Sequence, residues 1–228
     1  MEDVLSVIAD DIAIMPMWQQ KIWAGFNVKP EGGVSEELLD SQVRVKPART
    51  QAPERYLEKG YRFLEEVFNA KFGIRLFQEH KEILQLFKKI NRFRSTNPEG
   101  FFSLAKDLNI LFAEAINTKE LQNQIRIPND TKWGSLKTLE NFLVQNVPLN
   151  ANVARDLMTP LVGIYELRHA DTHLRGSSLD NAYSMSEVDK NLDFIFQGFW
   201  ILMSFVNTLY KLIEVIKRNM TERTEHFL

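Results

Sequence analysis

The spacing of apolar residues constrains this chain most, because it becomes helical near residue 54 and stays helical almost to the C-terminus. Apolar positions recur every three to five residues, which is the period of one face of an α-helix. Two such series are Tyr56, Tyr61, Leu64, Val67 and Phe68, and Leu76, Ile83, Leu84, Phe87 and Ile90. The alternation typical of a strand is limited to residues 42–45. The sequence therefore predicts an all-α fold, an antiparallel helical bundle.

Two asparagines mark predicted helix starts. Asn97 is followed by Pro98, and an N-cap residue with a proline in the first turn is typical of a helix N-terminus. Asn150 is placed to cap a helix that runs from residue 151 to about residue 174. Between these two, the apolar spacing predicts a helix that begins at residue 131 or 135 and ends at residue 146.

The C-terminal part predicts one long helix. The helix predicted from residue 151 contains Pro160 in its middle, which predicts a kink or a restart there. Gly176 is the predicted C-terminal stop of this helix. A loop is predicted over residues 176–185. Ser186 then opens a pattern that resembles a capping box, which predicts a last helix running towards Met220.

The first 53 residues lack the helical period. Four of the eight prolines lie there, and residues 27–53 are predicted to form a long surface loop. We therefore divide the chain into an N-terminal helical or loop segment, residues 1–53, and a helical bundle, residues 54–228. The segment is either a docking arm for a protein partner or a loop held on its own domain by Trp18, Trp23 and Phe26.

Composition excludes several classes of protein. The 28 Lys and Arg residues against 30 Asp and Glu give a net charge of -2, so any RNA contact needs a local patch. The absence of cysteine excludes disulfides, thiolate metal sites and a cysteine nucleophile. The acidic N-terminus lacks a signal-peptide pattern, which predicts a cytoplasmic location. The long uncharged run 194–210 contains Gln197 and Asn207, which favours a buried bundle helix and no membrane span.

One polar cluster in the sequence carries chemistry, and it contains Arg168, His169, Asp171 and His173. A first interpretation is a charged helix terminus, where histidines interact favourably with the helix dipole. A second is a metal site, since His169 and His173 are four residues apart as in zinc-protease helices, although Ala170 stands where those proteases need a glutamate base. A third interpretation is catalytic.

The spacing from Arg168 to His173 resembles the Arg-x4-6-His signature of the HEPN superfamily, whose following position is polar and is filled here by His169. The context is similar as well, with a helix before the motif and a long helix after it. The resemblance covers residues 151–220. It implies a metal-independent endoribonuclease without a cofactor, which acts as a homodimer with both motifs in one cleft. Such domains concentrate in prokaryotic defence and toxin systems.

The motif residues suit the cleavage of RNA. A base that removes the proton of a 2′-OH lets its oxygen attack the adjacent phosphorus, which leaves a 2′,3′-cyclic phosphate and a 5′-OH. His173 titrates near neutrality and can act as base or acid, and Arg168 stabilises the charge on the phosphoryl oxygens. On one ideal helix, five steps place His173 about 140° away from Arg168. Joint action therefore needs an unwound helix end or a second subunit.

Three neighbouring residues have supporting roles in this hypothesis, each with a structural alternative. Asp171 orients a histidine or caps the turn, Arg175 binds the RNA backbone or faces solvent, and Tyr165 donates a hydrogen bond or packs in the core. HEPN toxins that are paired with a nucleotidyltransferase have a tyrosine two residues after the histidine. Because Arg175 stands there, silencing by modification of that residue is not expected.

A basic cluster in residues 88–94 contains Lys88, Lys89 and Arg92. On a helix Lys88 and Arg92 share a face, which predicts either an electrostatic track for RNA or a solvated surface diluted by nearby glutamates. The function that competes with the ribonuclease is a HEPN-like module without cleavage activity, which serves as a dimerisation or partner-binding domain of a larger assembly.

Overall fold

The structure is a computed structural model. It describes residues 12–25, 39, 43–45, 52–78, 83–129, 131–168 and 176–225, with side chains described up to residue 218. The chain divides into two compact units, residues 1–50 and 51–228. In the first unit, helix α2 (Met17–Gly25) has no buried residue, and Trp18 on this helix is exposed.

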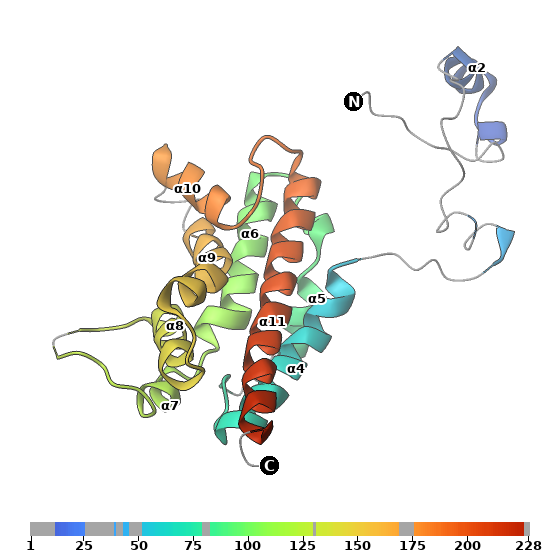
Figure 1. The fold of residues 1–228 in the computed structure, drawn as a ribbon. Helices are drawn as coiled ribbons and strands as arrows, with labels where there is room; N and C mark the ends of the chain where they lie inside the picture. The colour runs from blue at the N-terminus through green and yellow to red at the C-terminus, as the bar shows by residue number, and fades with distance from the viewer. Residues whose placement is uncertain are drawn as a thin grey trace. The chain divides into compact units, whose positions relative to one another are not determined.

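The second unit is built from helices joined by turns (Figure 1). In chain order they are α4 (Glu54–Phe72), α5 (Ile83–Lys89), the 3-10 turn η2 (Arg92–Arg94), α6 (Pro98–Asn109), the π-turn η3 (Ile110–Glu114), α7 (Thr118–Gln122), α8 (Ser135–Asn146), α9 (Ala151–Leu167), α10 (Ser177–Met185) and α11 (Phe194–Glu225). Across the described residues, extended pairing is limited to one bridge between Phe77 and Ile116. The prediction of an all-α fold with a long C-terminal helix is confirmed.

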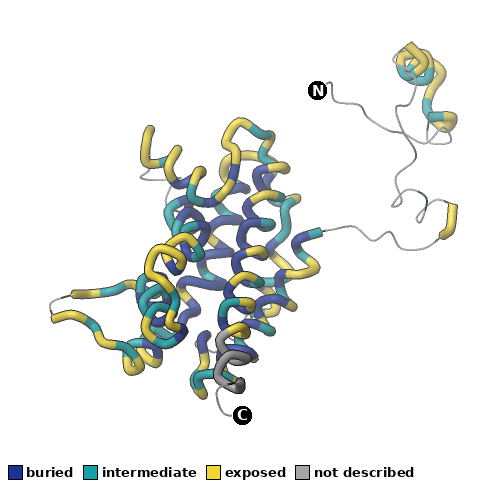
Figure 2. The backbone as a smooth tube through the Cα atoms, viewed as in Figure 1, coloured by how far each residue is buried: buried dark blue, intermediate teal, exposed yellow. Residues whose placement is uncertain are grey.

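Helix α11 lies at the centre of this unit, packed against α4, α6, α9 and η2. Figure 2 shows that buried residues gather where the helices face one another. Phe112 meets Phe205 of α11 edge to face, with ring centroids 5.9 Å apart. Gly60 of α4 lies beside Tyr210, and the Lys71 ammonium donates to the Ile216 carbonyl at 2.9 Å, so α4 and α11 run in the same direction.

Both predicted asparagine caps are confirmed. The Asn97 side chain accepts a hydrogen bond from the Gly100 backbone N–H at 2.8 Å, and Asn150 accepts one from the Asn152 N–H at 2.9 Å. Each bond satisfies a backbone donor that the first helical turn leaves without a partner. Helix α8 also lies where the apolar spacing predicts it.

The predicted loop over residues 176–185 is wrong, because residues 177–185 form helix α10. Gly163 of α9 makes this packing possible: a Cβ there would lie 2.3 Å from the Ser186 backbone nitrogen. Gly176 has φ 63° and is the N-cap residue of α10, and the helix end that it is predicted to stop lies outside the described residues. The two helices thus pack backbone to backbone at a position that only glycine tolerates.

Two further boundaries differ from prediction. Ser186 ends α10 instead of opening α11, because its hydroxyl donates to the Tyr183 carbonyl at 2.9 Å. Helix α11 begins at Phe194, and the Gln197 N–H donates to the Asp193 carbonyl there. Helix α9 runs without interruption through Pro160, so the predicted restart at that proline does not occur.

Helix α11 is long and apolar enough, by length and composition, to cross a membrane, and 56% of its most apolar window is buried inside the bundle. Buried polar side chains of its described part have protein partners. Gln197 accepts a hydrogen bond from the Tyr183 hydroxyl at 3.0 Å and donates to the Leu192 carbonyl at 2.6 Å, and the Ser204 hydroxyl donates to Glu187 at 2.9 Å. These contacts give α11 the environment of a core helix.

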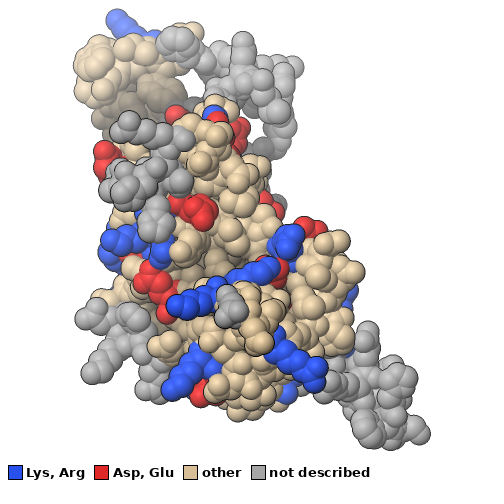
Figure 3. Space-filling model, turned by 90° about the vertical axis from the view of Figure 1, so that its left-hand side faces the viewer, with Lys and Arg blue, Asp and Glu red and all other residues tan. Residues whose placement is uncertain are grey.

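Acidic and basic side chains intermingle on the face of the molecule that Figure 3 shows. This matches the near balance of the net charge, -2 over the whole chain. That face therefore lacks the broad single-sign field that would steer a polyanion by charge alone.

Candidate functional site

Arg168 is the C-cap residue of α9, where its backbone N–H donates to the Ile164 carbonyl at 3.3 Å. The described part of this helix ends at Leu167, earlier than the predicted end near residue 174. The four other motif positions, His169, Asp171, His173 and Arg175, lie outside the described residues. The structure therefore places Arg168 and Tyr165, one turn apart on α9.

The Arg168 guanidinium contacts an acid and an aromatic ring. Its Nη1 donates to the Glu114 carboxylate at 2.7 Å, across 54 residues of sequence. Its Cζ atom lies 4.0 Å from the centroid of the Tyr165 ring, which is a cation–π contact. The Arg168 side chain is 17% exposed, whereas the Glu114 side chain is 52% exposed. The cation of this ion pair, Arg168, is therefore largely buried, whereas its counter-ion Glu114 is half-exposed to solvent.

The π-turn η3 explains how Glu114 reaches this position. The Asn109 amide donates to the Glu114 carboxylate at 2.8 Å, although these residues are five apart. On a regular α-helix five steps amount to about 140° of rotation, so the two side chains would diverge. A π-turn bonds each residue to the one five positions away, which brings Asn109 and Glu114 onto one side. Such turns occur frequently at functional sites.

Asn109 is buried, and its side-chain oxygen has no hydrogen-bond partner among the described residues. A buried amide oxygen without a partner is unfavourable by roughly 1–3 kcal/mol. Its amide nitrogen nevertheless holds Glu114, which in turn holds Arg168. Asn109, Glu114, Arg168 and Tyr165 together form what we term the arginine site.

Sequence reasoning missed Glu114 and Asn109. One signal was present, because Asn109 interrupts the apolar series that contains Leu108, Leu111 and Phe112. Asn109 is buried with these apolar neighbours. A buried polar residue within a helical apolar face needs a partner. Nothing in the sequence, however, shows that Asn109 binds Glu114 or that Glu114 binds Arg168.

The predicted basic cluster is divided between two elements, because α5 ends at Lys89 and Arg92 begins η2. Lys88 and Arg92 therefore do not share one helix. The Lys89 ammonium lies 3.1 Å from the Asp107 carboxylate. Arg92 lies 3.7 Å from Glu54 and donates its backbone N–H to the same carboxylate at 3.0 Å. Of the three predicted cations, two are thus paired with carboxylates.

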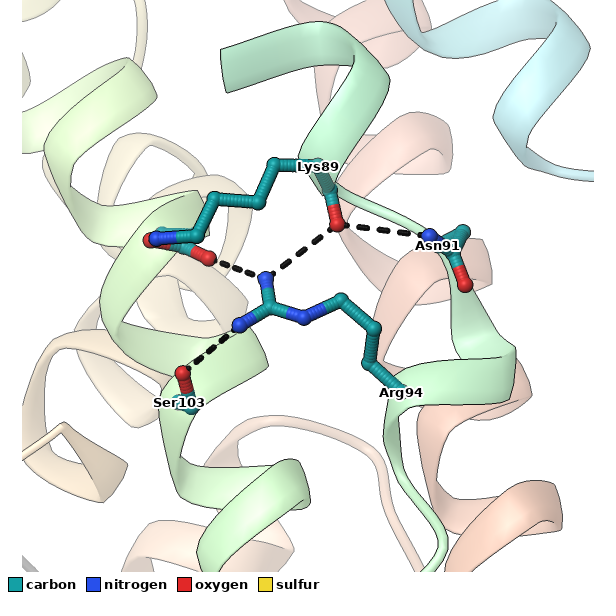
Figure 4. A network of polar contacts seen from close by, with 5 residues as sticks. Lys89, Asn91, Arg94 and Ser103 are labelled. Carbon is teal, nitrogen blue, oxygen red and sulfur yellow. Dashed lines mark hydrogen bonds and ion pairs between the residues drawn. The ribbon is translucent and has the colours of Figure 1, made fainter. Parts of the chain in front are cut away.

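Figure 4 shows how Arg94 completes this second ionic network. Its guanidinium pairs with the Asp107 carboxylate, donates to the Lys89 carbonyl at 3.2 Å and donates to the Ser103 hydroxyl at 2.9 Å. Asn91 donates to the same Lys89 carbonyl at 3.3 Å. We call these residues the Asp107 network. It caps the C-terminus of α5 and ties α5 and η2 to α6.

Within the described part of the chain, no three His, Asp or Glu side chains are grouped so that they could hold a metal ion. The predicted pair His169 and His173 lies outside that part. The chain matches no protein-family model, no curated protein and no solved structure. The arginine site is therefore interpreted from its own residues.

Proposed function

We propose that this protein is a metal-independent endoribonuclease of the HEPN type, which cleaves RNA with Arg168 and His173. The observation that carries the proposal is the Arg-x4-His motif at the end of α9 in an all-α fold, with its arginine held from two sides. Glu114 and Tyr165 fix the guanidinium before any substrate arrives. Preorganised donors are the main source of transition-state stabilisation in such sites.

The proposed reaction assigns a role to each group. His173 takes the proton of the 2′-OH, and the oxygen attacks the adjacent phosphorus. A protonated histidine of the motif, His169 or the His173 of a second subunit, gives a proton to the leaving 5′-oxygen. The products are a 2′,3′-cyclic phosphate and a 5′-OH. The Arg168 guanidinium binds the phosphoryl oxygens, where the phosphate competes with the half-exposed Glu114 carboxylate.

The proposed setting follows from the same resemblance. The protein acts as a homodimer with both motifs in one cleft, in the cytoplasm, as a component of a prokaryotic defence or toxin system. The N-terminal segment, residues 1–53, binds a protein partner that controls the activity. Asp171 and Arg175 support the histidine and the RNA backbone.

The test is cleavage of a synthetic RNA in EDTA by the full chain and by Arg168→Ala and His173→Ala. Loss of one preorganised donor costs about 100-fold or more in rate, so both variants should fall at least that far below wild type. The matched control is Arg155→Ala, an exposed arginine on the same helix. Mass spectrometry should find the cyclic phosphate. An inactive wild type, or equal losses in Arg155→Ala and Arg168→Ala, contradicts the proposal.

A second candidate is a HEPN-like dimerisation or partner-binding module without cleavage activity. The Glu114 to Arg168 contact favours it, because it joins α9 to η3 and is what a purely structural strut would look like. In that case wild type does not cleave RNA, and Arg168→Ala weakens the fold or the dimer. Urea unfolding and sedimentation velocity of the same variants separate the two candidates.

A further inference from the structure

Helix α11 packs into the core of the bundle but keeps one line of residues exposed. Its other sides pack against α4, α6, α9 and η2. The exposed residues of this line follow one another at intervals of three, four or seven positions, which places them on one face of the helix. They are Phe196, Trp200, Asn207, Lys211, Glu214 and Arg218. We call these six residues, together with the exposed Asp193 just before the helix, the α11 stripe.

The N-terminal half of the α11 stripe is apolar. Phe196 is 57% exposed and Trp200 is 46% exposed. Met203, which is half-buried, lies next along the same face. Tryptophan is among the residues that contribute most to binding when a protein interface covers them. Two large rings in water on an otherwise buried helix therefore indicate a surface that is covered by a partner.

Acidic residues adjoin this apolar half. The turn 187–193 contains the exposed acids Glu187, Asp189 and Asp193 and one lysine. The Ser204 hydroxyl donates to Glu187 at 2.9 Å, which holds that acid beside α11. The lysine, Lys190, is already paired with an acid of α10 at 2.5 Å. This end of the α11 stripe is therefore negative.

The C-terminal half of the α11 stripe is basic. Residues 211–218 contain three cations and one acid, and the acid Glu214 pairs with Arg218 at 2.5 Å. Lys211 and Lys217 supply the remaining positive charge, and both are exposed. Lys217 lies over the Phe63 ring of α4, 4.2 Å from its centroid. One continuous face thus has opposite charges at its two ends.

We propose that the α11 stripe binds the α11 stripe of a second copy of this chain, with the two helices antiparallel about a two-fold axis. In this arrangement the acidic end of each copy faces the basic end of the other, and the rings meet in the middle. A parallel pair would bring like charges together. A surface that carries both complementary parts is what a two-fold interface requires, because the same patch serves both partners.

The register follows from the charges. Asp193 and Lys211 are 18 positions apart, which is five full turns, so they lie on one line along the helix. Each is nine positions from Leu202. A two-fold axis level with Leu202 therefore places Asp193 of one copy opposite Lys211 of the other, twice. Trp200 then lies beside the axis, where the rings of both copies pack together.

The size of this face suits a dimer. The α11 stripe is about 38 Å long at about 1.5 Å per residue, and α4 and the turn 187–193 flank it. A face about two helices wide, roughly 20 Å, has an area of about 760 Å², close to the roughly 800 Å² per partner of a standard interface. A membrane is a poorer occupant, since the charged residues of both ends would have to enter it with the rings.

This interface is separate from the arginine site. Phe205 contacts Phe112 of η3, and it lies five positions after Trp200, about 140° around α11. Glu114, at the end of η3, is thus remote from the α11 stripe. The inference therefore goes beyond the proposed function. A chain that also pairs its two motifs in one cleft has two different two-fold interfaces and forms a tetramer, and a chain that does not forms a dimer.

The experiment measures the mass of the full chain by sedimentation velocity between about 1 μM and 100 μM, without detergent. Trp200→Ala should sediment at half the wild-type mass, because loss of two central tryptophans weakens association by about 100-fold or more. Asp193→Lys and Lys211→Asp should each weaken association by about tenfold, since each puts like charges opposite one another twice. An equal mixture of these two variants should regain the wild-type mass, because each position 193 again faces an opposite charge.

The matched controls are the same reversals on exposed residues of other helices, Lys119→Asp of α7 and Asp156→Lys of α9, which should keep the wild-type mass. Circular dichroism checks that each variant is folded. A monomeric wild type, or a wild-type mass in Trp200→Ala, overturns the proposal. A mixture that stays at half the mass overturns the antiparallel register. Flotation of a monomeric wild type with phosphatidylcholine vesicles overturns the proposal as well and assigns the rings to a membrane.

The two proposals fail separately. Cleavage of RNA by a chain whose mass is unchanged in Trp200→Ala removes only the α11 interface. Half the wild-type mass in Trp200→Ala, with no cleavage by wild type, removes the ribonuclease and keeps the interface.

Discussion

The Asp107 network and the arginine site pair the same kinds of groups in opposite ways. In the first, the carboxylate is buried, with 4% of its side chain exposed, and the Lys89 cation is 56% exposed. In the second, the Arg168 cation is the buried partner at 17%, and the Glu114 carboxylate is 52% exposed. Both carboxylates lie on the run formed by α6 and η3.

The difference indicates that the ion pairs of Asp107 are the more permanent ones. Asp107 is held by two cations, and Arg94 has two further acceptors, so the network satisfies its members within the protein. Arg168 pairs with an acid that water already solvates, so the ion pair with Glu114 contributes less than the pairs of Asp107 do and opens more readily to another anion. A buried cation with an exchangeable counter-ion is what a phosphate site requires, whereas the Asp107 network resembles a structural clamp.

The largest expected effect is on the Asp107 network. Asp107→Asn weakens the hydrogen bonds that Asp107 accepts from Lys89 and Arg94, and because bonds to charged groups contribute roughly 1.5–3 kcal/mol each, the free energy of unfolding should fall by about 3 kcal/mol. Urea unfolding followed by circular dichroism measures it. A loss below 1 kcal/mol would mean that Asp107 is no more structural than Glu114, and the comparison would fail.

The buried hydrogen bond between Tyr183 and Gln197 is uncharged, so its contribution to stability is a reference for the two ionic sites. Burial raises the pKa of Tyr183 to about 12, and its hydroxyl donates to Gln197. The unfolded tyrosine titrates near 10, so the unfolded state loses its proton first. The stability from this group is complete below about pH 10 and is lost as pH rises to about 12, by between about 2 and 3 kcal/mol.

Unfolding of wild type and Tyr183→Phe at pH 9 and pH 11.5 measures this contribution. Burial also raises the pKa of Tyr61 and of Tyr210, so three tyrosines cost wild type stability at high pH and only the difference between the proteins reports Tyr183. The variant should lose less on going to high pH. A fall of the same size in both proteins would show that ionisation of Tyr183 does not matter.

The smallest effect is expected at the arginine site. Glu114→Gln should lower the free energy of unfolding by about 1 kcal/mol, because the glutamine oxygen can still accept from Arg168 and Asn109 and the charge that is lost is half-exposed. That small loss should shrink further in 1 M NaCl, where surface charges are screened over about 3 Å. Asp107→Asn provides the contrast, since a buried pair is screened much less. An equal salt response in both variants would contradict the distinction.

Much of the fold could be predicted because it depends on local signals. The apolar period located α4, α6 and α8, and the caps at Asn97 and Asn150 fixed two helix starts within a residue. Helix α10 escaped because its buried residues are Ala182 and Tyr183, too few to make a period, among serines and an asparagine typical of a loop.

The arginine site was less accessible to sequence reasoning. Arg168 and Tyr165 stood out from their own segment, but Glu114 lies 54 residues away and looks like any other solvent-facing acid. Its position depends on a π-turn, and no composition signal distinguishes that turn from a regular helix. The start of α11 was misplaced for a related reason, since Ser186 bonds backwards to Tyr183 and a capping pattern does not show direction.

The π-turn η3 also has a genetic consequence. Five residues, Ile110 to Glu114, form its wide loop, and deletion of one codon there would restore a regular helix. The glutamate would then follow Asn109 by four residues, and a regular helix places such a pair on one face, so the acid would keep its place beside the guanidinium. A three-nucleotide deletion in this short stretch of the gene should thus leave the contact between the two helices intact.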